Sequence, residues 1–164
     1  MAKKVAMTGM FVALAMIFSY VEVLIPINLG IPGMKLGLAN LVVVFMLYRL
    51  SFKEAFIVSI MRILLSGFMF GNLMSIAFSL AGALFSISVM CVLKRWNGFS
   101  VMGVSVAGGC MHNVGQLCVS IFVVQTARLV YYIPVLLISG VVTGLLIGLL
   151  VKLMLRHIPT AYTG

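Results

Sequence analysis

Apolar residues fill this chain in long stretches, separated by short breaks that contain glycine, proline or charged residues. A helix needs about 20 apolar residues to cross a bilayer core of about 30 Å, and most of the stretches approach this length. The pattern predicts helices at residues 5–24, 37–50, 54–70, 72–93, 101–125 and 131–154. We therefore expect an all-α fold, a polytopic membrane protein built as a six-transmembrane-helix bundle.

The second predicted helix is too short for a simple crossing. Residues 37–50, at 1.5 Å per residue, reach only about 21 Å. This helix is expected either to borrow the residues from Met34 to Leu36 or to have its ends buried by neighbouring helices.

Composition supports a membrane domain and leaves no room for another. Of 164 residues, 64% are hydrophobic and 8% are charged, whereas soluble domains are about 25% charged. We expect one integral membrane domain over residues 1–164. Lys3 and Lys4 precede an apolar stretch without a small-residue cleavage pattern, so the first stretch is expected to stay as a helix.

The basic residues predict the orientation. A cytoplasmic start places eight of the eleven inside: Lys3, Lys4, Arg49, Lys53, Lys94, Arg95, Lys152 and Arg156. Lys35 and Arg128 fall outside, and Arg62 falls within a helix. This bias follows the positive-inside rule and predicts a multi-pass cell-membrane protein with both termini cytoplasmic. The net charge of +9 then reflects contact with anionic lipid, and no contiguous basic face points to nucleic acid.

A stripe of small residues opens the first helix. Ala2, Ala6, Gly9 and Ala13 recur at intervals of four, three and four, which places them on one helix face. In lipid, such stripes let two helix backbones approach closely. The stripe favours either packing within the bundle or docking of a separate membrane partner.

The connection between the first two helices, residues 26–40, is rich in proline and glycine and nearly free of charge. Irregular backbone this apolar is tolerated at membrane depth only where protein buries it or where it lines a cavity. We therefore expect an apolar outer loop or cap. Lys35 within it either contacts a ligand at the rim of a cavity or extends to lipid headgroups.

Arg62 is expected about eight residues into the third helix, where a charge is costly. It needs a partner, and Glu22 near the outer end of the first helix is one candidate. The alternatives are a structural role for Arg62 and contact with an anionic ligand.

The fifth helix carries a polar patch beside glycines. His112, Asn113 and Gln116 lie close together, and His112 and Gln116 are four apart on one face. The patch favours either hydrogen bonds between helices or the lining of a polar substrate pocket. Asn40 and Asn72 are expected to add amide contacts on the same side, which completes a candidate substrate-binding set with Lys35 and Arg62.

Motifs for catalysis and for cofactors are missing. The chain has two glutamates and no aspartate, no phosphate-binding glycine loop and no Ser-His-Asp set. Elongation of a prenyl diphosphate through Mg²⁺ needs clustered carboxylates, which two separated glutamates do not supply. No second histidine accompanies His112 at ligand spacing, and the cysteines Cys91, Cys110 and Cys118 have no Cys-x-x-Cys spacing. We expect no catalytic residues, no bound metal and no cofactor.

Two segments resemble a known family. The run IPGMKLGLANL at Ile31–Leu41 and the run AGGCMHNVGQ at Ala107–Gln116, with the six-helix layout, resemble the Gx transporter family, also catalogued as heptaprenyl diphosphate synthase component I. The layout is more distantly similar to the substrate-binding S components of energy-coupling factor transporters.

The resemblance implies a substrate-binding transport subunit. Its substrate would be a vitamin-like or flavin-like small molecule, and its first-helix stripe would dock on a transmembrane coupling subunit powered by separate ATPases. A non-catalytic membrane accessory of polyprenyl diphosphate synthesis is the alternative that the second family name implies. A purely structural membrane scaffold is a third hypothesis.

Overall fold

The computed structural model describes residues 2–24, 37–96 and 98–158, with side chains from residue 4 onward. The described residues form α1 (Ala2–Leu24), α2 (Asn40–Arg49), α3 (Phe52–Phe70), α4 (Leu73–Arg95), α5 (Val101–Val124), the 3-10 helix η1 (Ala127–Tyr132) and α6 (Ile133–His157). Each predicted helix is present, with ends a few residues from those expected, and the all-α class is confirmed. Residues 26–36 of the expected cap, which include Lys35, lie outside the described residues.

Among the described residues, four segments are long and apolar enough to cross a membrane: Lys4–Leu24, Leu73–Arg95, Val101–Val124 and Ala127–His157. The sequence pattern predicted six. Helix α2 has only 10 residues, which span about 15 Å, and α3 carries Lys53, Glu54 and Arg62. Many large apolar side chains are exposed on the long helices, and Phe68 and Phe122 are examples at 74% and 76%. Exposed apolar surface on this scale fits a membrane protein.

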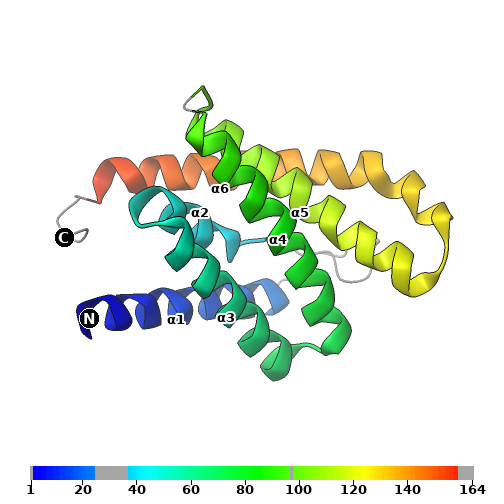
Figure 1. Ribbon diagram of the computed structural model, residues 1–164, viewed down its shortest axis with the longest axis horizontal. Helices are drawn as coiled ribbons and strands as arrows, with labels where there is room; N and C mark the ends of the chain where they lie inside the picture. Colours follow the sequence, from blue (N-terminus) through cyan, green and yellow to red (C-terminus); the bar gives the residue numbers. More distant parts are fainter. Residues whose placement is uncertain (1, 25–36, 97, 159–164) are drawn as a thin grey trace.

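The helices are arranged as a chain of packed neighbours (Figure 1). Helix α5 packs against both α4 and α6, α3 joins α4 to α1, and α2 contacts α3 and α6. Helix α1 begins and α6 ends at the same side of the molecule, on the left in Figure 1.

Helix α2 lies in the interior. Every residue from Leu41 to Leu47 is buried, and most of them belong to the larger hydrophobic core. A helix that is apolar on all sides is stable where neighbours surround it. The short second stretch of the sequence is therefore an enclosed helix.

Basic side chains hold the carboxyl-terminal ends of α2 and α6. The ammonium group of Lys94 donates to the carbonyl oxygen of Leu47 and lies 5.3 Å from the centre of the Tyr48 ring. The guanidinium of Arg49 donates to the carbonyl of Leu155 at 2.7 Å and to that of Ile158. Cations stabilise such ends because the last carbonyls of a helix have no partner in the helix.

Glycines set the close contact between α5 and α6. A Cβ atom added at Gly140 would lie 2.8 Å from Cα of Cys110, and one added at Gly144 would lie 2.6 Å from Cα of Val106. Gly148 approaches Met102 in the same way. These glycines recur every four residues along α6, the small-residue spacing that lets membrane helices touch through their backbones.

Candidate functional site

The small residues of α1 face outward. Ala6, Gly9 and Ala13 are exposed, and a Cβ atom at Gly9 would meet nothing within 4 Å. The side chain of Ala2 is not described. Helix α1 packs on the rest of the molecule through the opposite face, which carries the buried residues Ala15, Ser19 and Glu22. The described part of the stripe is therefore not used for packing within the bundle.

Arg62 and Asn40 meet in the interior. Arg62 is only 8% exposed, and its Nη2 atom donates to Oδ1 of Asn40 at 3.2 Å. Among the described residues, Nε of Arg62 has no hydrogen-bond partner. Because Asn40 is the first residue of α2 and Arg62 lies near the middle of α3, α2 begins about halfway along its neighbour.

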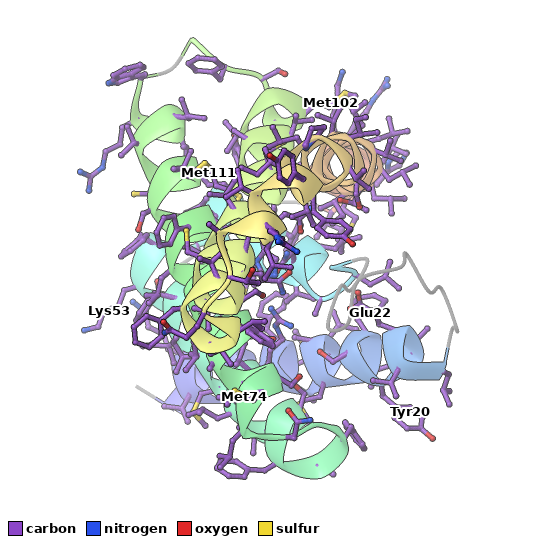
Figure 2. The ribbon with its side chains drawn as sticks, turned by 90° about the vertical axis from the view of Figure 1, so that its right-hand side faces the viewer. Tyr20, Glu22, Lys53, Met74, Met102 and Met111 are labelled. Atoms are coloured by element: carbon purple, nitrogen blue, oxygen red, sulfur yellow. The ribbon has the colours of Figure 1, made fainter. Side chains whose placement is uncertain are left out.

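Glu22 lies beside this pair. Its carboxylate interacts electrostatically with Arg62 and accepts a hydrogen bond from the backbone N–H of Gly37. Figure 2 shows Glu22 pointing from α1 toward the rest of the bundle. The expected proximity of Glu22 and Arg62 is thus present, and the carboxylate also fixes the backbone that leads into α2.

A small cavity of about 20 Å³ lies next to Asn40. Its polar lining comes from α2, α4, α5 and α6, and consists of Asn40, Ser86, Ser105, His112, Asn113 and Thr143. Gly37, Gly108, Gly109 and Gly144 contribute backbone, and Val44, Met90 and Ile147 contribute apolar surface. A volume of this size holds about one water-sized group, whereas pockets for whole drug-sized ligands measure about 300–1,000 Å³.

His112 and Asn113 are held in place by close contacts in the middle of α5. A Cβ atom at Gly82 would lie 2.9 Å from Nδ1 of His112, so α4 passes directly beside the imidazole. Asn113 donates from Nδ2 to the carbonyl oxygen of Leu136 at 2.7 Å. His112 and Asn113 therefore both pack between helices and line the cavity. Whether this cavity binds a substrate stays a prediction.

Two other predicted site residues lie elsewhere. Asn72 is exposed at the turn between α3 and α4, and its side chain caps α4 by accepting from the backbone N–H of Ser75 at 2.8 Å. Gln116 is partly buried one turn beyond His112 and does not line the cavity.

Sequence reasoning missed Ser86, Ser105 and Thr143. Serine and threonine are common in membrane helices, where they hydrogen-bond to the preceding turn, as Thr143 does to the carbonyl of Ser139 at 2.9 Å. The one sequence signal that could have indicated Thr143 is the glycine repeat of α6, because Thr143 is next to Gly144. That repeat indicates which face of α6 meets α5.

Replacing Asn40 by leucine is expected to lower the free energy of unfolding by about 1.5–3 kcal/mol, because it removes a hydrogen bond to a buried charge. Asn40→Asp keeps an oxygen for Arg62 and is expected to cost much less. Denaturant unfolding in mixed micelles, followed by circular dichroism, measures both variants. Equal stability of Asn40→Leu and the wild type would show that Arg62 does not depend on this contact.

No group of three His, Cys, Asp or Glu side chains that could hold a metal is found among the described residues. The three cysteines are free thiols, with Cys91 and Cys110 partly buried and Cys118 exposed.

These features define an all-helical membrane protein with an enclosed short helix and a small polar cavity among its central helices. The chain belongs to the family described as heptaprenyl diphosphate synthase component I, whose model matches residues 11–154. That description names the family as a component of a synthase. No curated protein and no solved structure matches the chain.

Proposed function

We propose that this chain is the membrane-embedded substrate-binding subunit of a small-molecule transporter, similar in role to an S component. The observation that carries the proposal is the polar cavity between the first half of α2 and the central parts of α4, α5 and α6. Polar and ionisable groups inside a membrane protein are costly, and substrate and ion pathways are among the sites that they mark. In this proposal the six helices form one bundle that lies in the cell membrane with both termini cytoplasmic, and α2 is its half-length member.

The proposed substrate is a vitamin-like or flavin-like small molecule, held by Asn40, His112 and Asn113. Arg62 supports Asn40 from behind. Because the cavity accommodates only a small group, binding of a larger molecule requires the surrounding helices to separate. Asn72 and Gln116 do not line the cavity, so they contribute only if such a motion brings them to the ligand. Lys35 stays a proposed ligand contact.

The exposed stripe of α1 supports a partner role. Ala6, Gly9 and Ala13 leave the backbone of α1 open to another membrane helix. In our proposal a transmembrane coupling subunit docks there, and separate ATPases supply energy, which suits a chain without a nucleotide-binding motif.

The family description favours a second candidate, a non-catalytic membrane accessory of polyprenyl diphosphate synthesis. The two glutamates lie on different helices, Glu22 on α1 and Glu54 at the start of α3, so the chain offers no carboxylate cluster for a metal-bound diphosphate. In this candidate the catalytic carboxylates belong to a soluble partner enzyme.

Purification of the tagged full-length chain from its native membrane separates the two candidates. We expect a small molecule to be released on denaturation and identified by mass spectrometry, together with a membrane subunit and ATPases. Recovery of a soluble prenyl diphosphate synthase, with no released small molecule, would instead establish the accessory role. Deletion of the gene gives an independent readout, since uptake falls under the first candidate and polyprenyl chain length or yield changes under the second.

A further inference from the structure

The two asparagines that line the cavity have fixed orientations. Oδ1 of Asn40 accepts from Arg62 at 3.2 Å. An arginine side chain has only donors, so the amide of Asn40 must keep its oxygen toward Arg62. Its Nδ2 group is the end left for the cavity, which Asn40 lines. Asn40 therefore offers a hydrogen-bond donor there.

Asn113 is fixed in the opposite sense. Its Nδ2 group donates to the carbonyl oxygen of Leu136 at 2.7 Å, and a backbone carbonyl can only accept. The Oδ1 atom is therefore the end of this amide that remains for the cavity. Asn113 offers an acceptor.

Both amides line the same cavity, which has room for about one water-sized group. A ligand edge with several atoms therefore reaches both amides only when the surrounding helices separate, as the proposed function requires. Gly37 keeps the space beside the donor open, because a Cβ atom at this position would lie 3.1 Å from Nδ2 of Asn40. Gly37 also has a positive φ of 76°, which favours glycine independently of the space.

We infer that the cavity recognises an uncharged ligand edge in which a carbonyl oxygen lies beside an N–H group, as in an amide, lactam or imide. The carbonyl accepts from Nδ2 of Asn40, and the N–H donates to Oδ1 of Asn113. This inference rests on the proposed role in binding a small molecule and names the chemical class of the part that is recognised.

The surroundings favour an uncharged edge over an acid. None of the described residues that line the cavity carries a carboxylate, an ammonium or a guanidinium group. Arg62 lies behind Asn40 and already interacts with the carboxylate of Glu22. A carboxylate in the cavity would place an oxygen against Oδ1 of Asn113 without a proton between them. Arg62 is thus a positioning residue that acts through the amide of Asn40.

The test uses succinimide and N-methylsuccinimide as probes, with acetate as a small anion, on the purified full-length chain in lipid nanodiscs. Saturation-transfer NMR measures binding. We expect succinimide to bind, N-methylsuccinimide to bind at least about tenfold more weakly because it lacks the N–H donor, and acetate to bind more weakly than succinimide. Equal binding of the two imides, preferred binding of acetate, or no binding of succinimide would overturn the inference.

Variants locate the binding. Asn40→Asp is isosteric and still accepts from Arg62, but it removes the donor, so succinimide binding is expected to fall at least about tenfold. Gln125→Glu makes the same amide-to-carboxylate change at an exposed position outside the cavity and is expected to bind like the wild type. Arg62→Lys retains a donor for Oδ1 of Asn40 and is expected to retain more binding than Arg62→Met. Unchanged binding by Asn40→Asp would contradict the inference.

Failure of this inference can be distinguished from failure of the proposed function. If a small molecule is released from the purified wild-type chain while succinimide does not bind, the recognition of an amide-like edge fails and the binding function stands. If no small molecule is released and the prenyl diphosphate synthase is captured, the transport proposal itself fails.

Discussion

Gly144→Ala is expected to lower the free energy of unfolding by about 1–3 kcal/mol, the usual cost of forcing an extra methyl group into a packed interior. The added Cβ atom would lie 2.6 Å from Cα of Val106 and 2.9 Å from the carbonyl oxygen of Ser105. Both atoms belong to the backbone of α5, so neither can move aside by a change of rotamer. Helices α5 and α6 would have to separate at the point where they line the cavity.

Gly9→Ala is the matched control, since it makes the same change where nothing lies within 4 Å. Alanine is a better helix former than glycine by about 1 kcal/mol, so this variant is expected to be as stable as the wild type or more stable. Reversible unfolding in mixed micelles measures both. A Gly144→Ala variant as stable as Gly9→Ala would mean that α5 and α6 do not touch as described.

Under the proposed transport function, Gly9→Leu is expected to abolish capture of the coupling subunit and substrate uptake without lowering the stability of the isolated chain. A leucine on the exposed stripe would hold a partner helix away from the backbone of α1. A Cβ atom at this position meets nothing within 4 Å, and the stripe faces away from the buried residues Ala15 and Glu22.

Ser88→Leu serves as the control, since it places a leucine at an exposed position on α4. This variant is expected to retain both capture and uptake. Quantitative affinity purification and uptake in cells that lack the chromosomal gene give the two readouts. Normal capture by Gly9→Leu would show that the stripe faces only lipid.

Local features of the sequence were sufficient for the helices themselves. Hydropathy and helix breakers depend on residues close in the chain, so the bounds of α5, expected at 101–125 and found at Val101–Val124, could be predicted well. The six membrane crossings expected from the sequence were not confirmed. Helix α2 has only 10 residues, and a helix this short is stable because its neighbours enclose it, which local sequence features do not reveal. The helix was expected to start at residue 37 but starts at Asn40, whose side-chain oxygen accepts a hydrogen bond from the buried Arg62 of α3.

For the site, the sequence indicated which polar residues were unusual, and Asn40, Arg62, His112 and Asn113 proved to lie together. It did not separate them from Asn72, which caps α4 at an exposed turn, or from Gln116. Nor did it find Ser86, Ser105 and Thr143. A polar residue in an apolar stretch shows that a hydrogen bond is needed. Its partner depends on which helices pack beside it, and this cannot be read from the local sequence.

The sequence by itself determined an apolar, all-helical membrane chain with a few costly polar groups, because burial in lipid depends on composition and local periodicity. Only the tertiary structure decided that the small residues of α1 face outward while those of α6 close on α5. It also decided that two asparagines present opposite ends of their amides to one cavity. The physical reason is that a hydrogen bond at one end of an asparagine amide fixes its orientation. The partner at that end therefore decides whether the amide offers its N–H donor or its oxygen acceptor to the cavity.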